Sequence, residues 1–524
     1  MSTRTAPAAS ALPLAFVGVL VAWPVAMVLV TGLAPRSLEV LTTASTWRIV
    51  AYTLAQAAVS TVLSLALALP AAYALDRLRV PGRGAMLAIL TVPFVLPTVV
   101  VGLAFRELLP FSGTTAAIIV AHVFFNVGLV VRVVGGLWAL IDPRWEEVAA
   151  TLGLSPWRAH LRATWPLLRP AVTASAVLVF LFTFTSFGVV LIVGDPSLPT
   201  VEVDIYQRTV QRLDLSGAAG LALLQLVIVA VALIASSVLQ ERLAVRQTLR
   251  PDPVAPRAAR TALDRAAIAY TVLLSVAVVV PLLALLLRSL RVGPGWGLSW
   301  YAEILDPSGT STREVPAAEA IALSLRYALI ATLIATALGV LAAVGINAAR
   351  RRGALVDAAV TLPLGVSAVT IGFGLLLASL RGPVDMRGWW VLIPLGQALV
   401  AMPVVVRVVL PVLRSLDPRL RQVAGTLGAP PLRAWLATEG AITGRAVAVG
   451  AALACAISLG EFGATAFLVR ADNPTMPIQI VRLLGRPGEA NLGQACALAV
   501  VLVLLTLAVV AFAERLRPAV RGGW

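Results

Sequence analysis

The amino-acid sequence predicts an all-α polytopic membrane protein in which about 12 transmembrane helices form two parallel six-helix halves. Three observations lead to this prediction. The 524 residues are 59% hydrophobic and only 13% charged, whereas soluble domains contain about 25% charged residues. About twelve apolar segments are long enough to cross a membrane. A polar motif that begins at Asp142 recurs without a gap at Asp417, which is 275 positions further along the chain.

Each apolar segment approaches or exceeds the roughly 20 residues that a helix needs to span a hydrocarbon core of about 30 Å. Hydrophobicity does not alternate at period two, so helices rather than a β-barrel are expected. The first segment is too long for the core of a signal peptide and is interpreted as a retained span. The expected spans are 11–32, 49–75, 85–105, 114–138, 171–194, 217–240, 266–288, 320–346, 354–380, 389–413, 446–469 and 492–513.

All 41 basic residues are arginine, and none is lysine. Groups of arginines follow the even-numbered spans, and the last group lies at the C-terminus. The positive-inside rule therefore places both termini and both copies of the polar motif in the cytoplasm. The net charge of +16 is then mainly a signal of topology. Nucleic-acid binding is the alternative explanation, but the chain has no soluble basic domain that could carry it.

The chain divides into an N-terminal half, 1–240, and a C-terminal half, 264–524, joined by the segment 241–263. The sequence Arg-Pro-Asp-Pro-Val-Ala-Pro in this segment is typical of an extended linker, and we expect it in the cytoplasm. An even number of spans in each half leaves the halves parallel, related by an axis along the membrane normal. Their interface is where a pathway through the membrane is expected.

Each polar motif has the start and stop signals of a short helix followed by a sharp turn. An aspartate can cap the helix, a proline suits its first position, and a glycine suits the left-handed residue at its end. These residues are Asp142, Pro143 and Gly153 in the first copy and Asp417, Pro418 and Gly428 in the second.

An apolar stripe at helical spacing follows one face of each motif helix. A ten-residue helix is marginal alone in water and gains stability when its stripe enters a groove. We therefore interpret the two motifs as docking sites for a symmetric soluble partner. The alternative is a loop helix that lies on the lipid surface. The stripes comprise Trp145, Val148, Ala149 and Leu152, and Leu420, Val423, Ala424 and Leu427.

The first motif resembles the Glu-Ala-Ala loop of type I ABC importer permeases, through Glu147-Val148-Ala149, then Gly153 and Pro166. The resemblance extends to both halves. It implies the MetI-like transmembrane fold, a bacterial cytoplasmic (inner) membrane location, and coupling loops at 142–166 and 417–441. The implied ATPase-coupling residues are Glu147, Ala149, Leu152, Gly153, Gln422, Ala424, Leu427 and Gly428.

The second copy departs from the family pattern, because Gln422 replaces the glutamate and Ala441 replaces the proline. This departure leaves open whether the two coupling sites are equivalent. Further motifs resemble the fused, double-length permeases for thiamine and ferric iron. They are 121–126 with Arg132, 185–188, 199–207 and 458–463. The resemblance implies a small cationic nutrient, thiamine before ferric iron, with other small cations or phosphonates as further possibilities.

The partners follow from the same resemblance. A P-loop uses a lysine to reach the nucleotide phosphates, and this chain has no lysine. We therefore expect no catalytic residues and no cofactor bound by this chain. ATP and Mg belong to a separate ATPase, expected in two copies. An extracytoplasmic binding protein is expected to deliver the substrate to segments 195–214, 291–316 or 470–491.

The strongest candidate for the substrate pathway is Glu461, because it falls inside the eleventh expected span. An ionised carboxylate there costs about 2.5–3.5 kcal/mol unless it faces water or a partner. A packing carboxylate near a helix break is the alternative, since Gly460 and Gly463 flank it. Weaker candidates are Asn126 and the three phenylalanines Phe124, Phe187 and Phe462. The phenylalanine rings could stack on a cation or simply pack. No metal-ligand spacing is present.

Two other classes of protein remain open at this stage. A secondary transporter could also have two parallel six-helix halves, but it would not need a capped helix and turn after the fourth span of both halves. A polytopic membrane enzyme would need clustered acids or histidines at one membrane face, and none cluster in this sequence.

Overall fold

The chain folds almost entirely into helices in a computed structural model, which describes residues 5–243, 254–305, 315–349, 353–382, 386, 388–416, 419–430, 433–434 and 440–516. Within these ranges, ten helices are long and apolar enough to cross a membrane. Two pairs of shorter helices, each sharply bent, raise the number to twelve if each pair is one span. The predicted all-α membrane fold is therefore confirmed.

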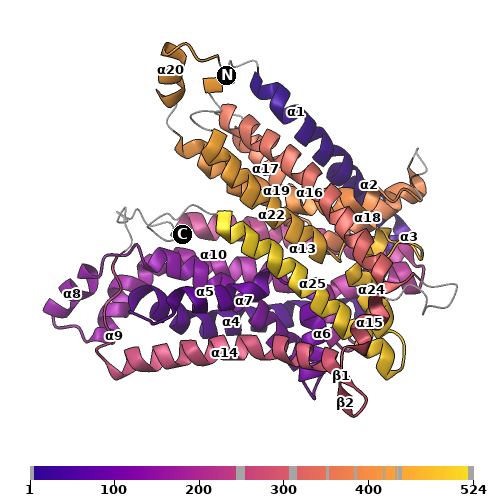
Figure 1. The fold of residues 1–524 in the computed structure, drawn as a ribbon, viewed down its shortest axis with the longest axis horizontal. Coiled ribbons are helices and arrows are strands. Elements are labelled where there is room, and N and C mark those ends of the chain that lie inside the picture. Colours follow the sequence, from indigo (N-terminus) through magenta and orange to yellow (C-terminus); the bar gives the residue numbers. More distant parts are fainter. Residues whose placement is uncertain are drawn as a thin grey trace.

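The first half contains the elements α1 to α13 (Figure 1). Their bounds are α1 Thr5–Val17, η1 Gly18–Ala22, α2 Trp23–Gly32, α3 Pro35–Leu38, η2 Glu39–Thr42, α4 Ala44–Arg77, α5 Arg83–Val95, α6 Thr98–Leu108, α7 Thr115–Trp138, α8 Arg144–Thr151, α9 Pro156–Ala159, η3 His160–Thr164, α10 Trp165–Phe184, α11 Gly188–Val193, α12 Val201–Tyr206, η4 Gln207–Gln211 and α13 Leu215–Leu243.

The second half follows with a similar order of long and short helices and one small antiparallel hairpin, β1 with β2. Its elements are α14 Ala262–Leu290, β1 Arg291–Val292, β2 Gly295–Trp296, α15 Ser299–Leu305, α16 Ala317–Ala348, α17 Gly353–Gly365, α18 Ala368–Arg381, α19 Leu392–Ser415, α20 Arg419–Thr426, α22 Ala441–Gly460, α23 Thr465–Leu468, α24 Met476–Leu484 and α25 Glu489–Leu516.

The helices form two bundles, and each bundle includes the first helix of the other half (Figure 1). Helix α14 packs against α4, α5 and α6, whereas α1 packs against α16 and α17. Accordingly, Val278 of α14 belongs to the apolar core of the first bundle, and Val17 of α1 belongs to that of the second. A third core joins the two bundles at the end of the molecule where α6 and α24 meet. The two halves of the sequence are therefore interlocked in space.

Two of the expected spans, 85–105 and 354–380, are broken rather than continuous. Helices α5 and α6 meet at 104°, and α17 and α18 meet at 84°. Pro97 stands at the first break and disfavours helical geometry at the residue before it. Ser367 stands at the second break, where its hydroxyl accepts the Thr370 N–H at 3.2 Å and caps α18. The sequence pattern showed the apolar length of these segments but not their bends.

Two other expected spans have wrong boundaries. The fifth, expected at 171–194, runs from His160 to Phe184, and the eleventh, expected at 446–469, runs from Ile442 to Gly460. The apolar residues that follow them form the short helices α11 and α23, most of whose residues are buried in the protein. Hydropathy does not distinguish a segment that is buried in protein from one that is buried in lipid, which explains both errors.

The last part of the linker segment packs against the first bundle, while 244–253 lie outside the described residues. The Val254 N–H donates to the Ala139 carbonyl at 2.8 Å, and the Arg257 N–H donates to the Arg77 carbonyl at 3.0 Å. These contacts place the linker beside the segment that leads into the first polar motif.

Candidate functional site

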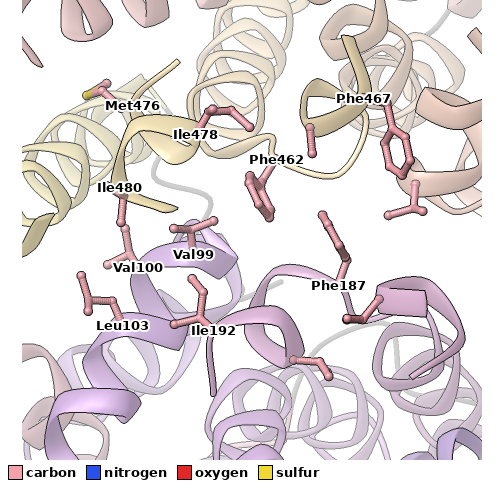
Figure 2. Packing of buried hydrophobic residues seen from close by; sticks show 14 of the residues in the cluster. Val99, Val100, Leu103, Phe187, Ile192, Phe462, Phe467, Met476, Ile478 and Ile480 are labelled. Carbon is pink, nitrogen blue, oxygen red and sulfur yellow. The ribbon is translucent and has the colours of Figure 1, made fainter. Parts of the chain in front are cut away.

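Two phenylalanines stack where the two bundles meet. The ring centroids of Phe187 and Phe462 are 5.0 Å apart, and their planes differ by 11°. The two residues occupy equivalent positions, because they are also 275 positions apart in the sequence. Figure 2 shows them facing each other from the two halves. The stack therefore joins equivalent positions of the two halves at the point where the bundles meet.

Glycines allow the backbones to approach closely around this stack. A Cβ on Gly188 would meet the Thr98 hydroxyl and lie 3.2 Å from the Phe462 ring. A Cβ on Gly460 would lie 3.0 Å from Pro97. Each of these close contacts involves the break between α5 and α6 or the short segment after a long helix. The apolar seal around the stack is completed by Val99, Val100, Leu103, Ile192, Met476, Ile478 and Ile480 (Figure 2).

The stack continues into a row of aromatic rings that the sequence did not single out. The Tyr206 ring lies 5.2 Å from Phe187, and the Phe467 ring lies 5.8 Å from Tyr206. Both residues lie in apolar runs, where an aromatic residue that faces lipid has the same sequence signature. Only the packing of α12 against the second half shows that these rings lie at the junction and do not face lipid.

The sequence predicted that Glu461 lies inside the eleventh span, but the structure places it just beyond the end of that span. Helix α22 ends at Gly460, so Glu461 follows the helix. Its carboxylate accepts the N–H groups of Ala464 at 2.7 Å and Thr465 at 3.0 Å, and also the Thr465 hydroxyl. This buried carboxylate caps α23 and holds the segment that carries Phe462.

The other predicted pathway residues lie apart from the stack. Phe124 packs edge-on against Phe105, with ring centroids 5.0 Å apart, in the core of the first bundle. The Asn126 side chain is buried and donates to the His122 carbonyl of its own helix at 2.8 Å. The structure therefore brings Phe187 and Phe462 together but places Phe124 and Asn126 elsewhere.

The two polar motifs lie at the other end of the molecule, in α8 and α20 (Figure 1). In the first, Asp142 Oδ1 accepts the Arg144 N–H at 3.0 Å, as a cap does. Gly153 has a φ of 79° and Gly428 a φ of 82°, so both end their helices in the left-handed conformation. Asp417, Pro418 and the side chains of Leu420, Gln422 and Ala441 lie outside the described residues.

Equivalent apolar side chains are exposed on the two motif helices. Val148 and Val423 are 55% and 57% exposed, and Leu152 and Leu427 are 78% and 82% exposed. Ala149 is buried, and Glu147 is exposed. Isolated exposed apolar residues are ordinary, but the same pair at the same place in each half indicates a repeated contact surface.

The first motif is held to the bundle by Glu146. Its Oε1 lies 3.1 Å from His160 Nδ1 and also accepts the Thr164 hydroxyl. Burial alone would raise the pKa of the Glu146 carboxyl, but these two contacts and the charge of Arg77 hold that pKa below its ordinary value. This contact orients α8 relative to the start of the fifth span.

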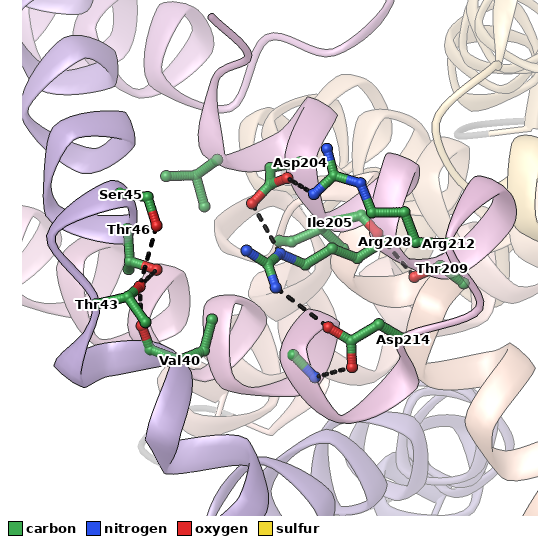
Figure 3. A network of polar contacts seen from close by, with 12 residues as sticks. Val40, Thr43, Ser45, Thr46, Asp204, Ile205, Arg208, Thr209, Arg212 and Asp214 are labelled. Atoms are coloured by element: carbon green, nitrogen blue, oxygen red, sulfur yellow. Dashed lines mark hydrogen bonds and ion pairs between the residues drawn. The ribbon is translucent and has the colours of Figure 1, made fainter. Parts of the chain in front are cut away.

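A charged network stiffens one of the segments predicted to receive a binding protein (Figure 3). Asp204 is buried and pairs with Arg208 at 2.9 Å and with Arg212 at 3.5 Å. Arg208 also pairs with Asp214 at 3.1 Å. The network surrounds the exposed Leu213, which has a φ of 54°. These ion pairs tie α12, η4 and the residue before α13 together at this outer turn.

Among the described residues, no group of three or more histidine, cysteine, aspartate or glutamate side chains could hold a metal ion. The sites that remain are therefore the aromatic junction, the two exposed motif helices and the outer turn.

Comparisons with known proteins show what the chain is similar to. Residues 64–248 match the family described as binding-protein-dependent transport system inner membrane component. The chain is 27% identical over 492 residues to the thiamine transport system permease protein ThiP of Salmonella typhimurium, covering 88% of each chain. It is 28% identical over 472 residues to ThiP of Escherichia coli, covering 84% of each. It is 34% identical over 190 residues to the molybdenum transport system permease protein ModB of Azotobacter vinelandii, covering 32% of this chain and 83% of that protein.

Proposed function

The chain belongs to the family of inner membrane components of binding-protein-dependent transport systems, as a fused type I ABC importer permease, and from this we propose that it forms the membrane pathway for thiamine. The thiamine permeases of two enteric bacteria align with both halves of this chain, whereas the molybdenum permease aligns with about a third of it. This difference favours thiamine as the substrate. Ferric iron has no comparable support.

The observation that carries the mechanism is the stack of Phe187 on Phe462 at one end of the molecule, with exposed motif helices at the other. In the proposed orientation, the arginine-rich end that carries the motifs and both termini is cytoplasmic. The aromatic stack is then an outer gate, which is closed in this structure. An aromatic seal excludes water and small ions because it offers no hydrogen bonds to replace those that they make with bulk water.

A separate ATPase, present in two copies, supplies the energy. Val148 and Leu152 enter a groove on one copy, and Val423 and Leu427 enter the equivalent groove on the other. Each buried leucine or valine contributes about 1.5–3 kcal/mol, so each site is a stable contact. ATP and Mg bind to that partner, and this chain hydrolyses nothing. When the ATPase copies close, they bring the two motif helices together and tilt the bundles, which separates Phe187 from Phe462.

A binding protein delivers thiamine at the opposite face. The turn that carries Leu213 is one contact, since its charged network fixes its shape. The segments 291–316 and 470–491 complete the surface, although 306–314 lie outside the described residues. The domain division into two permease halves and a cytoplasmic linker belongs to the same proposal.

The test is uptake of radiolabelled thiamine into liposomes that contain the chain with its ATPase and binding protein. We expect uptake that requires ATP, the ATPase and the binding protein together. Ferric ions and molybdate serve as competitor substrates, and neither should be taken up. Thiamine uptake driven by an ion gradient without the ATPase would contradict the proposal.

A further inference from the structure

The described residues include five buried carboxylates, and four of them have strong partners. Asp76 pairs with Arg83, Asp204 with Arg208 and Arg212, and Asp264 with Arg257, while Glu461 accepts the N–H groups of Ala464 and Thr465. The fifth is Glu202, which has no exposed surface. Buried charges are normally paired, so the surroundings of Glu202 need an explanation.

The polar neighbours of the Glu202 carboxylate within the described residues are uncharged. The Gln225 amide donates to Oε1, and the Ser367 hydroxyl lies beside the carboxylate. Oε2 has no hydrogen bond of normal geometry. Three further oxygens lack partners: Gln225 Oε1, the hydroxyl of Thr200 two residues before Glu202, and the hydroxyl of Thr370 three residues after Ser367. Among the described residues, this site therefore contains several unpartnered oxygen atoms and no cation.

Glu202 lies beside the outer gate and at the contact between the two halves. It is four positions before Tyr206 in α12, so both side chains lie on one face of that helix. The Tyr206 ring packs on Phe187. Ser367 belongs to the other half, at the break between α17 and α18. Separation of the halves at the gate would therefore remove Ser367 from Glu202 and expose Oε2 to whatever passes.

We propose that Glu202 is the counter-charge that an organic cation meets as it passes the outer gate. The proposal rests on the proposed function, because it takes the space between the halves as the substrate pathway. The equivalent position in the second half is Pro477, so Glu202 has no counterpart there. Glu461, which the sequence favoured for this role, is already saturated by the N–H groups of the short helix that it caps.

A purely structural role makes a different prediction. A neutral glutamic acid that only fills space and accepts from Gln225 is mimicked well by glutamine, which has nearly the same shape and keeps one carbonyl oxygen as an acceptor. A residue that must carry a negative charge is not. Glu202→Gln thus separates the two roles, and Glu319→Gln makes the same chemical change at an exposed carboxylate at the start of α16.

The first experiment measures thiamine uptake and ATPase stimulation by the loaded binding protein in liposomes containing the complete complex. Glu202→Gln should lower the uptake rate about ten- to hundredfold, because a contact with a charged group is lost. Assembly and ATPase stimulation should match those of the unmodified protein and of Glu319→Gln. Unchanged uptake, or loss of assembly together with uptake, would overturn the proposal.

The second experiment does not depend on thiamine. The variant Phe187→Cys is made in a chain that also carries Cys455→Ala and Cys496→Ala. The complex that contains it is then trapped with vanadate. The rates of modification by a trimethylammonium thiosulfonate and by a sulfonate thiosulfonate report the local charge. The preference for the cationic reagent should fall several-fold in Glu202→Gln. An unchanged preference would reject the counter-charge, whereas absence of thiamine uptake by the unmodified complex would reject only the proposed substrate.

Discussion

Gly460 of the second half lies directly against Pro97 of the first, so that a Cβ on Gly460 would lie 3.0 Å from the Pro97 Cγ. Pro97 marks the break between α5 and α6, and Gly460 ends α22. Both residues are adjacent in sequence to segments that carry the outer gate. A Cβ at position 460 would therefore force Pro97 to shift by a few tenths of an ångström, so the proposed closed gate depends on this close contact.

Gly460→Val should weaken the closed gate, because the added methyl groups push α22 away from Pro97. Overpacking costs about 1–3 kcal/mol, which corresponds to a shift toward the open gate of roughly five- to 150-fold. We expect a raised ATPase rate without binding protein and reduced coupled uptake. Gly444→Val is the matched control, since Gly444 lies in the same helix with open space around it. Equal effects of the two substitutions would argue against a gate contact.

The stacked rings themselves should seal the pathway. Replacing Phe187 or Phe462 by alanine removes a buried ring from a tightly packed site, which costs about 3–5 kcal/mol of packing. We expect leakage of a small fluorescent cation from liposomes that contain the complex without ATP. Phe512→Ala removes a ring of the same size from an exposed position in α25 and should cause no leakage. A sealed membrane in both gate variants would mean that the barrier lies elsewhere.

The sequence predicted the repeat of the polar motif and the helix signals of both copies. Those features were predicted because caps, left-handed glycines and repeats depend on neighbouring residues. The stacking of the rings, the bends at Pro97 and Ser367 and the exchange of α1 and α14 were not predicted. They arise from contacts between segments far apart in the sequence, and hydropathy assigns the same value to burial in lipid and in protein.

The sequence pointed to Glu461 rather than Glu202 as the pathway carboxylate for the same reason, because hydropathy does not show which segments are buried in protein. Glu461 falls inside a long apolar segment, so the sequence marks it as a charge within the membrane. The break after Gly460 turns it into a helix cap. Glu202 lies in a short segment that the hydropathy pattern left outside the spans, and only the fold shows that it is buried beside the gate.

The two motif helices should contribute to ATPase binding through Leu152 and Leu427. Leu152→Ala and Leu427→Ala each remove an exposed apolar side chain that the partner would bury, at about 1.5–3 kcal/mol per site. The affinity for the ATPase, measured with the purified chain in nanodiscs, should fall about ten- to hundredfold for each variant. Leu504→Ala, at an exposed position of α25, is the control. A large effect at Leu152 and none at Leu427 would show that the departure at Gln422 makes the sites unequal.

The contact of Glu146 with His160 and Thr164 should make the position of α8 depend on pH. The pKa of Glu146 is lower in the folded protein than its ordinary value of 4.5. Its stabilising contribution is therefore fully present above pH 4.5 and is lost as the pH falls through the folded value. After correction for the intrinsic pH dependence of exchange, the protection of the α8 amides should fall over this range, and Glu146→Gln should remove most of this change. Equal exchange in both proteins at all pH values would exclude this role.

The linker end should hold the two interlocked halves together even without a covalent connection. The Arg257 guanidinium donates to both oxygens of Asp264, at 2.8 and 3.0 Å, and to the Tyr73 hydroxyl at 2.8 Å. Asp264 also accepts the N–H groups of Arg260 and Thr261, each at 3.0 Å. Tyr73 belongs to the first half, so this cluster fixes the start of α14 to the bundle that α14 joins. The exchange of α1 and α14 adds a large apolar contact on both sides.

Two fragments, 1–248 and 249–524, should consequently co-purify as one complex when they are expressed together, and the complex should transport. Asp264→Ala leaves a partly exposed arginine and a tyrosine without their acceptor, which costs roughly 1–3 kcal/mol. In the fused chain the connection compensates, because the effective concentration of the halves is high. In the split chain the same substitution should release the second fragment during size-exclusion chromatography. Retention of both fragments after the substitution would show that the apolar exchange of α1 and α14 suffices, and that the polar cluster contributes nothing to assembly.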